Sequence, residues 1–263
     1  MSGAPPPLPL APQRVVELQH GHNFRDIGGY RAGSVTTRWG CVYRSGSLAW
    51  LSHEDQDQLQ ARGISAIFDL RSDGERRARP SRVERLQPAI HGWREHPGSV
   101  ANLLTAMRRR DTSSGDLRQM MIGFYRELPF EQSESLSKVY QLIAGGSVPL
   151  IVHCSAGKDR TGVAIALLLA LVGVEHDLIF EDYLLTESCF EKTRGMVIRE
   201  NAQQGATPVD VRIWEPVLRA DPAYLDAMFE TVMERCGSLD AYFEQHLRVD
   251  APARAAIRRH LTG

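Results

Sequence analysis

The stretch that decides the fold runs from Leu150 to Gly162 and reads LIVHCSAGKDRTG. Its apolar start, Leu150 to Val152, is typical of a short buried strand. An apolar helical pattern begins at about Arg160. A strand that passes through a glycine-containing loop into a helix predicts an α/β fold. In such a loop the backbone N–H groups and the helix N-terminus converge on one point. The sequence therefore predicts a cradle for an anion the size of a phosphate.

Cys154 is expected at the floor of this cradle, where the donors that would hold a phosphate also stabilise a thiolate. A thiolate is a strong nucleophile near neutral pH. Arg160, six residues further on, can turn back into the cradle and bind two phosphoryl oxygens with its planar fork. Thr161 can donate its hydroxyl to the sulfur, and Gly157 and Gly162 allow the backbone to close around the anion.

The combination of these features carries the prediction. A C-x5-R spacing alone occurs by chance, and a buried cysteine is usually a small apolar core residue. Here the strand, the His-Cys pair, the loop glycine, the arginine, the hydroxyl residue and the helix all follow in order. His153 is expected to hold the loop by hydrogen bonds. The predicted substrate-binding residues are His153, Ser155, Ala156, Gly157, Lys158, Asp159, Arg160, Thr161 and Arg44.

Length and composition fit one α/β domain with a helical C-terminal part. The chain has 263 residues, of which 43% are hydrophobic and 24% charged, as in soluble globular proteins. We expect a disordered proline-rich start over residues 1–13 and a single domain over residues 14–263. A net charge of -1 disfavours a nucleic-acid-binding protein.

The longest apolar run, Val163 to Val174, is too short to span a bilayer, and the first residues do not resemble a secretory signal. A cytoplasmic location is expected, and export without a signal peptide stays open. The four cysteines, at positions 41, 154, 189 and 236, form no C-x-x-C pair. Neither a disulfide framework nor a zinc site is expected, and Cys41, Cys189 and Cys236 are assigned to packing. No metal or other cofactor is expected.

Local patterns predict the other elements. The predicted strands are residues 41–43 and 64–69, and the predicted helices are a segment capped by Ser52 that ends near Gly63, residues 134–144, a segment from Asp221 to Gly237, and one capped by Ser238. A polar turn is predicted at residues 71–74 and an exposed mobile tip at residues 108–115. The β-α-β spacing of the first half favours a parallel sheet.

The loop resembles that of the cysteine-based protein tyrosine phosphatases. Its string HCSAGKDRTG is similar to that of an atypical bacterial tyrosine/serine phosphatase group, which includes mycobacterial tyrosine phosphatase B. Further matching stretches are Asn23 to Gly29, Tyr43 to Ser45, Asp69 to Ser72 with Glu75 beyond, Tyr224-Leu225, and Gly237 to Leu239. The resemblance covers roughly residues 20–260.

The resemblance implies a parallel-sheet fold surrounded by helices, with a helical lid and no metal. It also implies activity on phosphotyrosine, phosphoserine or phosphothreonine and phosphoinositides, so that phosphorylated proteins or peptides are the expected partners. The stretch between His96 and Phe124, where the lid should begin, looks shorter than in the mycobacterial member. The oligomeric state is left open.

Two aspartates are candidates for the general acid that protonates the leaving group. The sequence has no Trp-Pro-Asp tripeptide, the motif that supplies this acid in many tyrosine phosphatases. Asp69 is favoured because it follows a predicted strand, at the sheet edge where ligands bind. It could instead form a structural ion pair with Arg71 or Arg44. Asp159, inside the loop, is the second candidate, and could instead form a loop ion pair or orient Arg160; the acid could also be neither of the two.

Lys158 is one of the chain's three lysines and is expected to add a point charge that faces the ligand. The alternative is a solvated side chain at the loop rim. Phosphatases that act on phosphoinositides carry the same loop lysine, which keeps lipid substrates open. Two other functions are less consistent with the loop: a rhodanese-like sulfurtransferase has a loop of different length, and a non-catalytic phosphate-binding module would usually lack the cysteine or the arginine.

Overall fold

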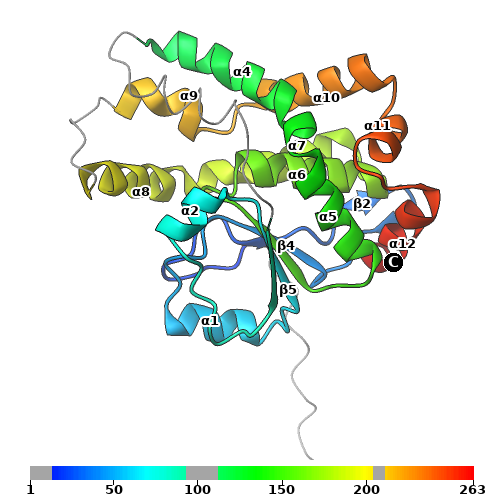
Figure 1. Ribbon diagram of the computed structural model, residues 1–263, viewed down its shortest axis with the longest axis horizontal. Helices are drawn as coiled ribbons and strands as arrows, with labels where there is room; N and C mark the ends of the chain where they lie inside the picture. The colour runs from blue at the N-terminus through cyan, green and yellow to red at the C-terminus, as the bar shows by residue number, and fades with distance from the viewer. Residues whose placement is uncertain (1–13, 93–111, 204–210) are drawn as a thin grey trace, which may run out of the picture.

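The computed structural model describes residues 14–92, 112–203 and 211–263 (Figure 1). The proline-rich start expected to be disordered and most of the expected exposed tip lie outside these ranges. The same holds for much of the stretch in which the lid was expected to begin.

A five-stranded sheet forms the centre of the fold, in the order β1-β4-β7-β5-β6. These strands are β1 (Arg25–Asp26), β4 (Val42–Ser45), β7 (Leu150–His153), β5 (Ala66–Asp69) and β6 (Ala89–Gly92). β4, β7, β5 and β6 are parallel, and β1 is antiparallel to β4. A separate hairpin pairs β2 (Arg31–Ala32) with β3 (Val35–Thr36). The prediction of a mostly parallel sheet flanked by helices is confirmed.

Helices follow or connect most of the strands. They are α1 (His53–Gln60), α2 (Asp73–Ala78), α4 (Ser114–Glu131), α5 (Ser133–Ala144), α6 (Asp159–Val172), α7 (His176–Leu184), α8 (Phe190–Gln203), α9 (Glu215–Leu218), α10 (Pro222–Cys236), α11 (Leu239–Gln245) and α12 (Ala251–Leu261). Two 3-10 segments, η1 (Leu185–Cys189) and η2 (Val211–Trp214), precede α8 and α9. In the described ranges, none of the helices combines the length and apolar character needed to cross a bilayer.

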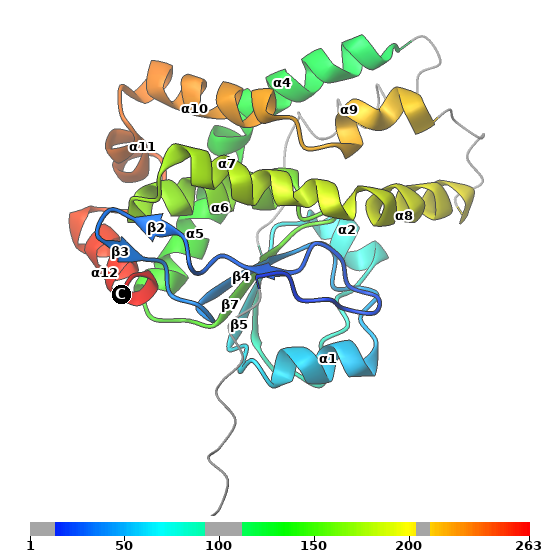
Figure 2. The same ribbon diagram turned by 180° about the vertical axis from the view of Figure 1, so that it is seen from behind.

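The two faces of the sheet bury different cores, because side chains alternate along each strand. Phe68 and Val152 belong to the larger core, which α4, α5, α6, α10 and α12 complete. Ile67 and Ile151 point the other way into a smaller core that includes Leu59 of α1. Figures 1 and 2 show the same division, with α1 apart from the helical layer that holds α5 and α6.

Capping boxes begin three of these helices. Ser52 with Asp55 begins α1, as predicted. Ser72 with Glu75 begins α2, so the prediction of a simple polar turn at residues 71–74 was wrong. Ser113 with Asp116 begins α4, so the end of the expected tip is exposed, as predicted, but forms the first turn of a long helix. In both places a helix forms because the serine and the acidic residue three positions later accept hydrogen bonds from the free N–H groups at the helix start.

The central strand leads into the predicted loop. β7 ends at His153, the loop follows, and α6 begins at Asp159. Gly157 has a φ of 69°, and a Cβ there would lie 2.5 Å from the carbonyl carbon of Ser45 at the end of β4. Only glycine allows this close approach, so the loop packs directly against the neighbouring strand.

Candidate active site

Cys154 lies where the central strand meets the loop, with 2% of its surface exposed. Within the described ranges, the backbone N–H groups of loop residues 155–158 donate to no carbonyl or side chain. α6 begins directly after them and adds the free donors of its first turn. Free donors beside a buried sulfur at a helix N-terminus suit both a thiolate and a bound oxyanion.

Arg160 returns to this loop from the first turn of α6, in a fixed orientation. Its Nη1 and Nη2 donate to the two carboxylate oxygens of Glu75, at 2.7 and 2.8 Å. Nη2 also lies 3.3 Å from the hydroxyl oxygen of Ser155, which itself donates to Glu75 at 2.6 Å. A paired carboxylate fixes the plane of the guanidinium, and this leaves its remaining N–H groups directed along defined lines.

Arg44, predicted to bind substrate, lies behind the loop instead. Its guanidinium is fully buried; Nη2 donates to the Gly157 carbonyl at 2.9 Å and Nη1 pairs with Asp182 of α7. Asn23 donates its amide to the carbonyls of Ala156 and Gly157, at 3.1 and 3.0 Å. The outer side of the loop is therefore held by side chains from two distant segments.

Asp69 is buried in an ion pair with Arg71. Nε of Arg71 contacts both carboxylate oxygens, and Nη2 donates to Oδ2 at 2.7 Å. Burial alone would raise the pKa of Asp69, but His153 and Arg71 outweigh it and hold the pKa below its usual value. The favoured acid of the sequence prediction is thus the ionised half of a structural pair.

Asp159 is the more accessible of the two candidate acids, with a side chain that is 21% exposed. Its Oδ1 accepts a hydrogen bond from the Tyr125 hydroxyl at 2.8 Å and lies 3.0 Å from Nζ of Lys158. In the described part of the chain no hydrogen bond reaches its Oδ2. One carboxylate oxygen is therefore held in place while the other is left for a ligand.

Lys158 does not direct its charge into the cradle, contrary to the sequence prediction, and it is not a solvated rim residue either. The side chain is 2% exposed, and Nζ donates to the carbonyls of Val217 and Arg219 at 2.6 and 2.8 Å. These carbonyls lie at the end of α9, where a helix has free acceptors and partial negative charge. Lys158 connects the loop to α9.

His153 and Thr161 are both fully buried beneath the loop. Nδ1 of His153 lies 3.3 Å from the Cys154 carbonyl, and Nε2 lies 3.5 Å from Oδ2 of Asp69. Burial lowers the pKa of His153, so the ring is neutral near pH 7. The hydroxyl of Thr161 has no hydrogen-bond partner among the described residues, so its predicted bond to the sulfur is not formed in this structure.

The other cysteines lie outside this site. All four cysteines are free thiols, and Cys41 and Cys236 pack against the larger core. No group of acidic, histidine and cysteine side chains that could hold a metal occurs among the described residues.

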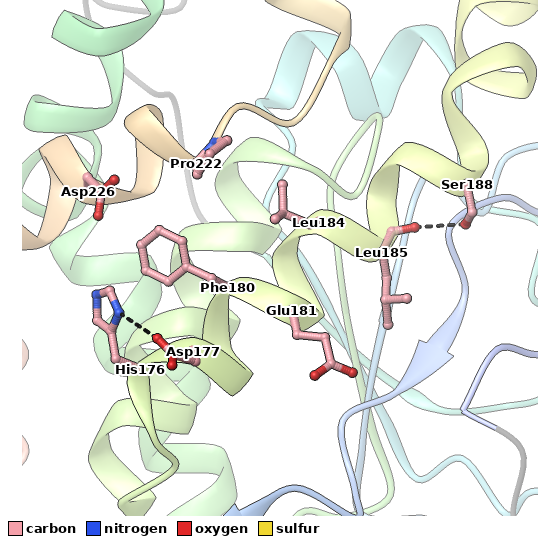
Figure 3. A pocket seen from close by; sticks show the side chains of 9 residues that line it. All are labelled: His176, Asp177, Phe180, Glu181, Leu184, Leu185, Ser188, Pro222 and Asp226. Atoms are coloured by element: carbon pink, nitrogen blue, oxygen red, sulfur yellow. Dashed lines mark hydrogen bonds and ion pairs between the residues drawn. The ribbon is translucent and has the colours of Figure 1, made fainter.

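A cavity of about 770 Å³ lies between α7 and the start of α10, lined by Phe180, Glu181 and Asp226 among others (Figure 3). No residue of the loop lines it.

Comparison with known proteins identifies the family. A model of the tyrosine phosphatase family matches residues 16–263, which include the whole site. The chain belongs to this family. It is therefore a cysteine-dependent phosphatase, as the loop predicted.

Two curated relatives cover most of the chain. A protein of Cupriavidus necator, described as a candidate tyrosine-protein phosphatase, is 32% identical over 90% of this chain and 85% of its own length. The triple specificity protein phosphatase PtpB of Mycobacterium tuberculosis is 31% identical over 87% of this chain and 92% of its own length. A tyrosine-protein phosphatase of Nostoc commune is 28% identical over 56% of this chain and 49% of its own.

Three residues of this candidate site were not assigned a role from the sequence. Glu75 and Asn23 stood in the matching stretches, and the capping-box spacing from Ser72 was the available signal for a fixed Glu75. Asp182 carried no signal, because nothing in its local sequence separates an inward-facing aspartate of α7 from a solvated one. These side chains hold the loop and the arginine from outside.

Proposed function

We propose that this phosphatase hydrolyses phosphomonoesters of tyrosine and of serine or threonine through a cysteinyl-phosphate on Cys154. One observation carries the proposal: the sulfur lies beneath a loop whose N–H groups donate to none of the described residues, and Glu75 fixes Arg160 beside it. Donors of this kind stabilise the charge on the phosphoryl oxygens as it develops.

The chemistry divides into two displacements. In the first, the Cys154 thiolate forms a sulfur–phosphorus bond while the phosphorus–oxygen bond to the leaving group breaks, and Asp159 gives that oxygen a proton. In the second, water attacks phosphorus and gives a proton to Asp159, and the thiolate leaves. Arg160 and the loop N–H groups bind the phosphoryl oxygens in both steps.

Asp159 is the better general acid of the two candidates because its carboxylate is accessible to a substrate. Its side chain is partly exposed, whereas that of Asp69 is 4% exposed and contacts Arg71 through both oxygens. A carboxylate whose pKa is lowered by such a pair rarely carries the proton that the leaving group needs. The Tyr125 hydroxyl holds Asp159 in place.

The breadth of substrates is tested by a panel run with the wild type and Cys154→Ser. The triple specificity in the name of the mycobacterial relative supports activity on both phosphotyrosine and phosphoserine or phosphothreonine. We expect turnover of phosphotyrosine and phosphoserine peptides that Cys154→Ser abolishes. Phosphoinositides form a separate arm of the panel, since Lys158 is directed away from the cradle. Failure to hydrolyse any phosphopeptide would refute the proposal.

A further inference from the structure

The loop carbonyls are held on the side away from the cradle. Asn23 donates to Ala156 and Gly157, and Arg44 donates to Gly157. In a trans peptide the carbonyl and the N–H of one unit point in opposite directions. Donors that hold these two carbonyls outward therefore turn the N–H groups of Gly157 and Lys158 toward the cradle.

Asn23 is itself fixed in an uncommon conformation. Its φ is 55°, in the left-handed region that asparagine tolerates better than most residues. Its Oδ1 accepts a hydrogen bond from Nη1 of Arg25, so the amide group cannot turn over without losing that bond. Nδ2 is left facing the loop, where it meets both carbonyls.

Asp182 links Asn23 and Arg44, the two donors to the loop, on the side away from the cradle. Its carboxylate is 1% exposed, with Oδ2 paired to Arg44 and Oδ1 lying 3.3 Å from both Nε of Arg25 and the Tyr30 hydroxyl. Its backbone carbonyl accepts from Nη2 of Arg25 at 2.7 Å. One buried carboxylate thus orients both arginines, one of which contacts the loop directly and the other through Asn23.

The charges in this cluster do not cancel. Two buried arginines, Arg25 and Arg44, share the one carboxylate of Asp182, and the excess positive charge lies behind a loop that binds an anion. In a buried setting such a charge acts over a longer range than in water. The cluster therefore has two effects on the cradle: it orients the peptide units of the loop, and its positive charge attracts a bound anion.

We propose that Asn23 and Arg44 are positioning residues of the phosphate-binding loop, and that Asp182 aligns them through its two arginines. The inference rests on the proposed function, since it assigns these residues to the same loop. Loss of the alignment turns loop N–H groups away from the anion and from the thiolate. It leaves Cys154 and the Glu75–Arg160 pair in place.

The test compares Asn23→Ala, Arg44→Lys and Asp182→Asn with the wild type. Arg44→Lys keeps the charge but loses the fork that reaches both partners. Tyr242→Phe is the matched control, because it removes a buried hydrogen bond, to the Pro129 carbonyl at 2.7 Å, far from the loop in sequence. Each variant is measured for melting temperature, for inhibition by vanadate, and for the rate of Cys154 alkylation by iodoacetamide at pH 7.

We expect Asn23→Ala and Arg44→Lys each to weaken vanadate inhibition about tenfold, as the loss of one or two buried hydrogen bonds implies. Alkylation at pH 7 should become slower in both. Tyr242→Phe should lower the melting temperature without either change. Wild-type vanadate inhibition and alkylation in Asn23→Ala and Arg44→Lys would overturn the proposal, even if Asp182→Asn fails to fold. Inhibition is measured with p-nitrophenyl phosphate as substrate and alkylation needs no turnover, so a wild type that hydrolyses no phosphopeptide would refute the proposed function alone.

Discussion

Both carboxylate oxygens of Glu75 accept hydrogen bonds from the guanidinium of Arg160, Oε2 from Nη1 at 2.7 Å and Oε1 from Nη2 at 2.8 Å. Glu75 also accepts from the Ser155 hydroxyl and, as part of its capping box, from the Ser72 backbone. Burial alone would raise the pKa of Glu75, but Arg160 and Ser155 hold it well below its usual range. A helix cap and Arg160, the arginine proposed to bind the phosphate, thus share one carboxylate.

Glu75→Gln should therefore lower kcat/KM by about 10- to 100-fold, because an amide presents one acceptor where the fork needs two. The folded-state pKa of Glu75 is below its ordinary value of 4.5, so its contribution to stability is present above that pH and is lost as pH falls below it. The wild-type melting temperature should fall more steeply below about pH 4.5 than that of the variant. If the melting temperatures of the two proteins fell equally steeply below pH 4.5, this assignment would be contradicted.

The general acid is tested by the basicity of the leaving group. Asp159→Asn should lower kcat strongly on phosphoserine peptides, about 100-fold or more, and much less on p-nitrophenyl phosphate, whose leaving group needs little protonation. Asp69→Asn should damage both substrates about equally and lower the melting temperature, because it breaks the buried pair with Arg71. If the two variants exchange these patterns, Asp69 is the acid and Asp159 is structural.

The sequence predicted those parts of the fold that depend on local pattern. The strand before Cys154, the apolar helix after Arg160 and the caps at Ser52, Asp221 and Ser238 all appear where they were expected. Each depends on residues within a few positions of one another. Helix α2 was missed although it carries the same cap, because its glycine and charged residues also fit a turn.

The side-chain partners within the site could not be predicted in the same way. The direction of the Lys158 side chain depends on the end of α9, about 60 residues later in the sequence. The direction of the Arg44 side chain depends on Asp182, which is still more distant in the sequence. Two arginines, Arg71 and Arg44, were possible partners of Asp69, and the structure pairs it with Arg71. Such contacts follow from the packing of whole elements, which sequence spacing does not encode.

Lys158 is expected to hold α9 rather than the ligand. Lys158→Met removes the donors to Val217 and Arg219 while keeping the length of the side chain. Limited proteolysis should become faster at residues 211–219, and vanadate inhibition should change by less than about threefold. The same substitution at the exposed Lys138 is the control. A tenfold loss of vanadate inhibition with unchanged proteolysis would show that the ammonium acts on the ligand.

The buried ring of His22 should give the folding stability a second dependence on pH. Its ring packs against Gly46, where a Cβ would lie 2.1 Å from Nε2, and burial lowers its pKa from 6.5 to about 4. Between these values the unfolded chain binds a proton that the folded chain does not, so stability should fall as pH drops from 6.5 to 4. The loss from this group amounts to about 3 kcal/mol.

His22→Gln should flatten that fall, as measured by urea unfolding at pH 7, 5.5 and 4. Part of the slope should persist, because the pKa of His153 is also lowered. The His22 assignment would be wrong if the variant lost as much stability between pH 7 and pH 4 as the wild type.

The proposed mechanism passes the phosphoryl group through a covalent bond to Cys154, and trapping that intermediate tests it most directly. The wild type is mixed with p-nitrophenyl phosphate, quenched in acid during turnover and digested, and the peptide that contains Cys154 is analysed by mass spectrometry. We expect one phosphoryl group on Cys154 in the wild type, none in Cys154→Ser, and turnover by that variant below about a thousandth of wild type. Phosphate on another residue, or turnover by Cys154→Ser above that level, would contradict it.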